Sequence, residues 1–125
     1  MTENEISYKI RGAIYNVYNE LGPGLLESIY AEALLYELRK NGLNVREEVK
    51  TPVYYDGELL KKEYRLDILV ENKVIIELKS VSEIAKIHHK QILTYLRLTK
   101  LKLGILVNFN EEDINDGIYR KVNGL

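Results

Sequence analysis

Residues 64–79 read YRLDILVENKVIIELK, two apolar runs on either side of a short polar turn. The first run alternates, which is typical of a strand with one buried face, and we expect residues 64, 66, 68 and 70 to share that face. The second run is apolar on both faces near its start, as in a central strand. We therefore predict two paired strands, over residues 59–70 and 74–81, that form a hairpin.

The segments before this hairpin predict two helices and a further strand. Apolar residues recur every three or four positions over residues 6–21 and 25–40, which is the period of a helix with one buried face. Gly22-Pro23-Gly24 separates the two helices. Residues 45–55 alternate loosely, and the Asp56-Gly57 turn predicts that they pair with the strand that follows.

The segments after the hairpin predict a helix and a buried strand. Ser82-Glu83 resembles a helix start, and we expect this helix to run to Thr99. Residues 103–109 predict a buried strand, and beyond them Ile118 and Val122 pack either as a last short strand or as a turn. The predicted fold class is α/β, of the α+β kind, in a single domain over residues 1–125. A mixed sheet is flanked by helices in the order helix, helix, three strands, helix, strand, and the last strand joins in parallel.

Composition excludes several kinds of protein. The chain has 125 residues, a formal net charge of −1 and no cysteine, which rules out a disulfide scaffold, a thiol nucleophile and a thiolate metal site. The polar first residues predict no signal peptide, and no apolar run reaches the roughly 20 residues that cross a bilayer. We therefore expect a cytoplasmic protein with no membrane association. The charge counts against a tight nucleic-acid binding module, which usually has a strongly basic surface, but not against an enzyme.

Three charged residues interrupt the apolar strands of the hairpin. Glu77 and Lys79 are two positions apart and share a face of their strand, and Asp67 on the paired strand can face them. Hard cations such as Mg²⁺ prefer a few carboxylates with water in the other positions, and a neighbouring lysine can hold the attacking water. An ordinary ion pair on a half-exposed sheet would look the same. The residues alone leave these two interpretations open.

Three short motifs, in order, resemble one known superfamily. Asp67 followed by Glu77-Leu78-Lys79 resembles the Asp…Glu-X-Lys signature of PD-(D/E)XK nucleases. Upstream, GLLESIY at residues 24–30 matches the pattern that names the GxxExxY family, a branch of that superfamily, and downstream QILTY at residues 91–95 resembles an element of RecB-like nucleases. The chain departs from the pattern in having no proline before Asp67. The resemblance implies a restriction-endonuclease-like core.

The resemblance also implies a metal site. Asp67 and Glu77 would bind Mg²⁺, with Mn²⁺ as a substitute, and the Leu78 carbonyl would assist them. Glu27 would be a further acidic ligand or would orient water on the metal. Without the family pattern, the preferred interpretation of Glu27 is a first-turn acid that the helix dipole favours.

Further residues are assigned to catalysis and substrate binding by the same resemblance. Lys79 would position the attacking water, and Gln91 and Tyr95 would support the site. The predicted substrate is nucleic acid, DNA ahead of RNA, and a homodimer with one subunit for each strand fits the resemblance. Residues expected to contact the substrate are Tyr30, His88 and Lys90, although Tyr30 also suits a core position and the other two a solvated surface.

Two other functions stay open at this point. The first is a catalytically inactive nuclease-like domain that binds nucleic acid or a protein. The second is an unrelated structural protein whose charged strand residues are ordinary ion pairs. The nuclease is preferred because every expected catalytic position holds a chemically competent residue.

Overall fold

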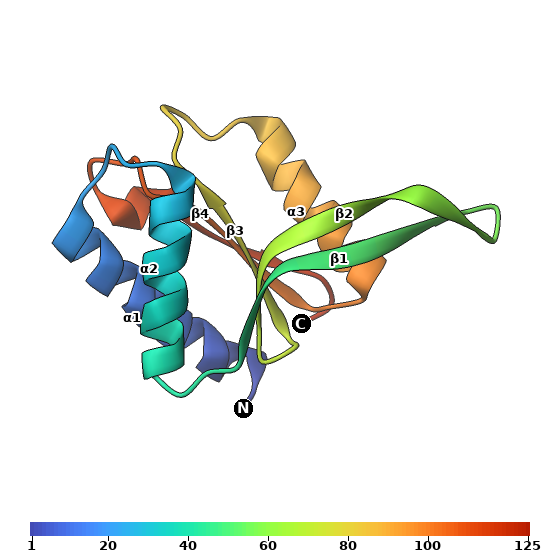
Figure 1. The fold of residues 1–125 in the computed structure, drawn as a ribbon, viewed down its shortest axis with the longest axis horizontal. Coiled ribbons are helices and arrows are strands. Elements are labelled where there is room, and N and C mark those ends of the chain that lie inside the picture. The colour runs from blue at the N-terminus through green and yellow to red at the C-terminus, as the bar shows by residue number, and fades with distance from the viewer.

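The computed structural model describes residues 1–125, which form three layers (Figure 1). Helices α1 and α2 cover one face of a five-stranded sheet, and α3 covers the other. The elements, in chain order, are α1 (Glu3–Leu21), α2 (Glu27–Lys40), β1 (Val45–Tyr55), β2 (Glu58–Val70), β3 (Val74–Lys79), α3 (Lys86–Thr99), β4 (Leu103–Asn108), the 3₁₀ helix η1 (Ile114–Gly117) and β5 (Ile118–Val122).

The strands lie in the order β1-β2-β3-β4-β5. Neighbours are antiparallel except β3 and β4, which run parallel because α3 crosses over between them. This mixed sheet confirms the predicted fold class. The segment that the sequence left open forms an edge strand, in which Val122 pairs with Leu103.

The start of α3 differs from the prediction. The helix begins at Lys86 instead of Ser82, and β3 ends at Lys79 instead of residue 81. The reason is a tertiary contact: the side chain of Asn108 accepts a hydrogen bond from the Val81 N–H (3.1 Å) and donates one to the Val81 carbonyl (3.0 Å). Those backbone groups are therefore used up outside both the strand and the helix.

The facing of β2 also differs from the prediction. Ile68 and Val70 pack in the core beneath α1 and α2, whereas Leu66 packs on the α3 side. The alternation breaks at Asp67, opposite the position of Glu48, where the β1–β2 pairing is interrupted and Glu48 adopts a left-handed φ of 52°. A local distortion of this kind turns a strand and redirects its side chains. Here it lies at a predicted metal ligand.

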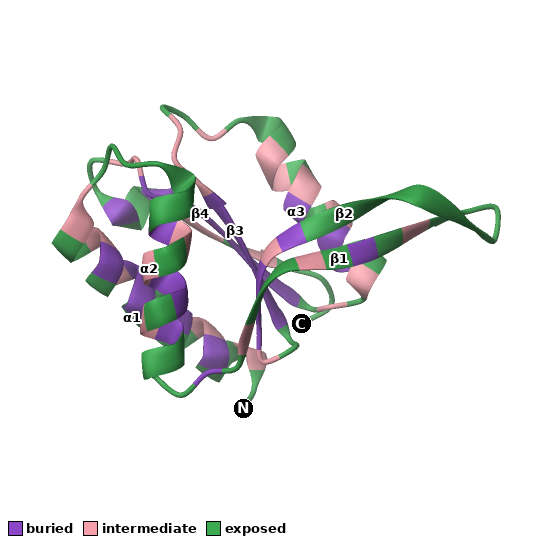
Figure 2. Ribbon diagram, viewed as in Figure 1, coloured by how far each residue is buried: buried purple, intermediate pink, exposed green.

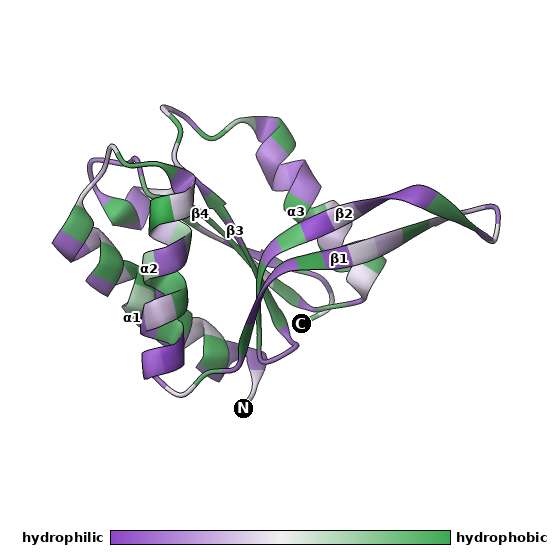
Figure 3. Ribbon diagram, in the orientation of Figure 1, coloured by the Kyte–Doolittle hydropathy of each residue, from purple (hydrophilic) through white to green (hydrophobic).

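The core is split by the sheet into a large and a small cluster. The large one lies between the sheet, α1 and α2, where Tyr30 stacks on Phe109 with ring centroids 4.5 Å apart. The small one includes Ile75, Tyr95 and Leu96 on the α3 side. Strands β3 and β4 are buried over nearly their whole length and are the most apolar part of the sheet (Figures 2 and 3).

The far half of the β1–β2 hairpin projects from the body as an arm (Figures 1 and 2). We define the arm as residues 52–65. All of its β2 residues, 58–65, are exposed, and so are Tyr54 and Tyr55 near the turn. Only its base touches the body, where Tyr64 packs edge-on against Tyr95 of α3 (centroids 5.1 Å apart).

Candidate metal centre

Asp67 and Glu77 meet where β2 and β3 separate. Pairing of these strands runs from Val70–Val74 to Ile68–Ile76 and then stops, so Asp67 and Glu77 occupy the next opposed positions. Their carboxylates replace the backbone hydrogen bonds between the two strands. The Asp67 N–H donates to Glu77 Oε1 (3.2 Å), and the Leu78 N–H donates to Asp67 Oδ2 (2.9 Å). Each side chain thus bonds to the backbone of the other strand at the point where the two strands separate.

The two acids lie in an environment that disfavours negative charge. Burial, followed by repulsion from Asp67, raises the pKa of Glu77 to about 9. Burial also raises the pKa of Asp67, against the opposing effect of the Leu78 N–H. Lys79 lowers the pKa of both acids, but a single ammonium does not offset their burial. A divalent cation would supply the missing positive charge.

Glu27 reaches the same region from the first turn of α2. It lines a cleft of about 270 Å³ together with Asp67 and Leu78, and its charge raises the pKa of Asp67. Its Oε1 accepts a hydrogen bond from the Ser80 N–H (3.4 Å), while Ser80 Oγ donates to the Leu25 carbonyl (2.5 Å). Ser80 therefore ties the loop before α2 to the end of β3.

The donor set fits a hard cation, with water completing it. Asp67 and Glu77 are two carboxylates side by side, the residue type that Mg²⁺ selects. No three His, Cys, Asp or Glu side chains gather closely enough to form a metal-binding group by themselves. Glu27 is exposed to solvent and lines the cleft together with Asp67. A small cation that keeps several waters suits this arrangement better than one that requires a full protein cage.

Tyr95 lies beside the acid pair on the α3 side. Its ring is 5% exposed, and burial, with added repulsion from Glu77 and Asp67, raises the pKa of its hydroxyl to about 12. The hydroxyl is therefore neutral and able to donate a hydrogen bond at physiological pH. Gln91, one turn earlier on α3, is half-buried, and its side chain makes no hydrogen bond to either acid or to Lys79.

Tyr30 is corrected from a substrate contact to a core residue. Its side chain is fully buried against Phe109, and its hydroxyl donates to the Gly22 carbonyl (2.5 Å) and accepts from the Leu25 N–H (3.1 Å). Tyr30 thereby holds the loop that leads to Glu27. The Tyr30 hydroxyl is therefore buried and already hydrogen-bonded, so it is not accessible to a substrate.

The other expected substrate contacts lie on α3. His88 Nδ1 accepts the Ala85 N–H (3.1 Å), so it caps the start of the helix. Lys90 is exposed, and no contact brings its ammonium to the acid pair. These two assignments stay predictions.

Asn108 and Ser80 are positioning residues that sequence reasoning missed. Asn108 is fully buried at the end of β4, directly beside Lys79 in the parallel pairing, and it clamps the loop that follows Lys79. An asparagine that ends the otherwise apolar run LGILVN was the available signal, because a buried amide needs partners. Ser80 had no comparable signal.

Comparison with known proteins identifies the family. A family model for the PD-(D/E)XK nuclease superfamily matches residues 4–121. The chain belongs to this superfamily. Nucleases of the PD-(D/E)XK superfamily generally use divalent metal ions and act on nucleic acid, and the arrangement of Asp67 and Glu77 fits that chemistry.

The same comparison places this PD-(D/E)XK domain beside a solved structure. The structure titled "Crystal structure of SSO0001" is similar to it, with 30% sequence identity and a TM-score of 0.59. The match covers 78% of this chain and 50% of that one, so the domain spans about half of the other protein's length. None of the curated proteins matches the chain. None of its helices is long and apolar enough to cross a membrane.

Proposed function

We propose that this domain is a metal-dependent nuclease of the GxxExxY branch that hydrolyses phosphodiester bonds, with DNA as its substrate. The observation that carries the proposal is the Asp67–Glu77 pair at the end of the β2–β3 pairing. Burial raises the pKa of both acids, and the one lysine beside them does not offset this effect. A bound divalent cation would stabilise the negative charges of both carboxylates. A merely structural ion pair would bring one acid and one base together instead.

The residues have distinct roles in this mechanism. Asp67 and Glu77 would hold Mg²⁺, with the Leu78 carbonyl and Glu27 as further oxygen donors. The ion supplies charge stabilisation at the phosphate and lowers the pKa of water. Lys79 lies two residues after Glu77 on the same face of β3, where its ammonium orients the attacking water and donates hydrogen bonds to the phosphate oxygens as charge develops.

The environment of these side chains supports the role of Lys79. Asn108 and Ser80 fix the loop that follows it, which limits the freedom of the lysine backbone. The Tyr95 hydroxyl is neutral and makes no hydrogen bond in the folded protein, so it is free to donate one to a phosphate oxygen of the substrate without adding charge. Water attacks phosphorus directly and the scissile P–O ester bond breaks, which releases an alcohol and a phosphate monoester, so no covalent enzyme intermediate forms.

Two measurements test the proposal together. Calorimetric titration with Mg²⁺ and Mn²⁺ compares the parent with Asp67→Asn, and Asp56→Asn at the exposed turn of the arm is the matched control. Cleavage of single-stranded DNA, double-stranded DNA and RNA compares the parent with Lys79→Ala, and Lys40→Ala at the end of α2 is the control. We expect loss of metal binding in the first comparison and of cleavage in the second. Metal binding without cleavage in the parent would point to an inactive binding domain.

A further inference from the structure

Helix α2 has a second apolar stripe that faces solvent. Its buried face consists of Tyr30, Leu34, Leu35 and Leu38. On another face, Leu26, Ile29 and Tyr36 are 72%, 44% and 66% exposed. These residues, with Ala33 between them, are spaced by three and four positions and so form one line along the helix. A helix normally buries such a line against another element, and this chain provides none.

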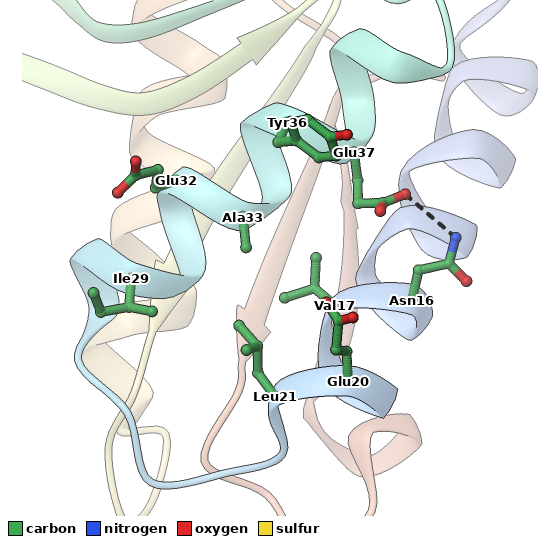
Figure 4. Close-up of a pocket in the computed structure, with 9 residues that line it drawn as sticks. All are labelled: Asn16, Val17, Glu20, Leu21, Ile29, Glu32, Ala33, Tyr36 and Glu37. Atoms are coloured by element: carbon green, nitrogen blue, oxygen red, sulfur yellow. Dashed lines mark hydrogen bonds between the residues drawn. The ribbon is translucent and has the colours of Figure 1, made fainter.

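The stripe borders a groove between α1 and α2 (Figure 4). The groove has a volume of about 400 Å³. Figure 4 shows Val17 and Leu21 of α1 pointing toward Ile29 and Ala33 of α2 across it. The size is at the low end for pockets that bind whole small molecules, roughly 300–1,000 Å³, and suits a few side chains of a larger partner.

The rim of the groove carries negative charge without compensation. Glu20 of α1 and Glu32 and Glu37 of α2 line it, and no Lys, Arg or His does. None of the three forms an ion pair, since the only salt bridge in the protein joins Lys50 to Glu63. Glu37 has only a long hydrogen bond from the Asn16 amide (3.4 Å). The groove therefore combines an apolar floor with acidic side chains that form no ion pair.

The negative charge of the rim excludes several classes of binding partner. Phosphate backbones and anionic membranes are repelled by the three carboxylates. A second copy that presented the same face would set those carboxylates against their own counterparts, which is unfavourable. What fits is a protein segment with apolar side chains beside lysine or arginine.

We propose that the α1/α2 groove docks an amphipathic helix of a partner protein, with leucine-like anchors flanked by lysine or arginine. A third helix laid between two helices matches anchors at the same three- and four-residue spacing as the stripe. The part of the stripe that lines the groove, from Ile29 to Tyr36, spans about 10 Å at 1.5 Å per residue, which matches about two turns of a bound helix. The groove is separate from the metal centre, so the proposal does not rest on the nuclease function.

The test uses a synthetic amphipathic helical peptide of leucine and lysine as the probe. Amide chemical shifts of the labelled full chain map where it binds, and fluorescence anisotropy of the labelled peptide gives its affinity. The charge variant is Glu20→Gln, Glu32→Gln and Glu37→Gln combined. Its matched control, with the same change in net charge at exposed sites, is Glu58→Gln, Glu83→Gln and Glu112→Gln combined. A peptide with glutamate in place of lysine is the second control.

The expected result is a set of shifts confined to α1 and α2. Affinity should fall on the order of tenfold or more in the groove variant and stay unchanged in the matched control. Ile29→Ser, which removes an exposed apolar side chain, should weaken binding without changing the folded spectrum elsewhere. The proposal is overturned by absence of binding, by equal binding of the glutamate peptide, by shifts centred on α3 or the arm, or by self-association of the chain that covers the groove.

Discussion

Asn108 lies directly beside Lys79 in the parallel pairing of β4 with β3, and its amide holds both backbone groups of Val81 two residues further on. The Phe109 N–H adds a bond to the Lys79 carbonyl (2.9 Å). The last residues of β3 are thus fixed from β4. The position of the proposed catalytic lysine depends on this neighbour as much as on its own strand.

Replacing Asn108 with alanine should therefore destabilise the protein and reduce cleavage. The Val81 N–H loses its only side-chain partner, and the Val81 carbonyl keeps only the bond from Asn110. An unsatisfied buried group costs about 1–3 kcal/mol. Asn110 donates only one bond to the same carbonyl (3.2 Å), so Asn110→Ala is the graded control. Urea unfolding gives the stability difference. Equal effects of the two substitutions would contradict the clamp.

The metal-free protein should lose stability as pH rises from about 4.5 to about 9. Over this window the folded protein keeps its proton on Glu77, whose pKa is raised to about 9, while the unfolded chain has already released it. The unfolded state then binds fewer protons, so the free energy of unfolding decreases with pH. The raised pKa of Asp67 acts in the same direction.

Glu77→Gln tests that pH dependence. Unfolding by urea in the presence of a chelator should show a flatter dependence of stability on pH than in the parent. Glu58→Gln on the exposed arm should leave the parent slope intact. A slope unchanged by Glu77→Gln would mean that the buried carboxyl does not titrate as the geometry predicts.

Mg²⁺ should raise the apparent stability of the parent. A ligand that binds only the folded state adds about 2.7 kcal/mol at a hundred times its dissociation constant. Asp67→Asn keeps an acceptor for the Leu78 N–H but removes the charge, so it should fold and lose this gain. Thermal unfolding at increasing Mg²⁺ checks the expectation, with Asp56→Asn as the control. A gain of equal size in Asp67→Asn would place the metal elsewhere.

Tyr95 allows the hydroxyl to be separated from the ring. Tyr95→Phe keeps the packing against Tyr64 and Leu96 and should leave stability nearly unchanged, because the hydroxyl makes no hydrogen bond in the folded protein. Tyr95→Ala should cost about 3–5 kcal/mol as a buried aromatic truncation. Cleavage rates then report the hydroxyl alone. Full activity in Tyr95→Phe would leave the residue a packing role only.

Sequence patterns predicted the parts of this fold that depend on local periodicity. The two N-terminal helices, the hairpin and the parallel strand after α3 follow from spacing and turn residues. The juxtaposition of Asp67 with Glu77 followed from a simple hairpin register. Each of these features depends on residues that are close together in the sequence.

The differences arise where a distant residue overrides the local pattern. Ser82 does not begin α3 because Asn108, far along the chain, takes the backbone groups of Val81. Leu66 left its predicted face because the strand turns at Asp67, where the ladders to both neighbours are interrupted. The Tyr30 hydroxyl bonds to the loop before α2 and is not available to a substrate. No spacing rule within one segment reports such contacts.

The arm sets how far the molecule can reach. Residues 58–62 cover nothing in the core, so lengthening or shortening the hairpin there opens no cavity and shifts no side chain near Asp67. Two-stranded ribbons have little stability of their own, and this one can open without unfolding the body. The length and sequence of the arm can therefore change in evolution without altering the proposed metal centre.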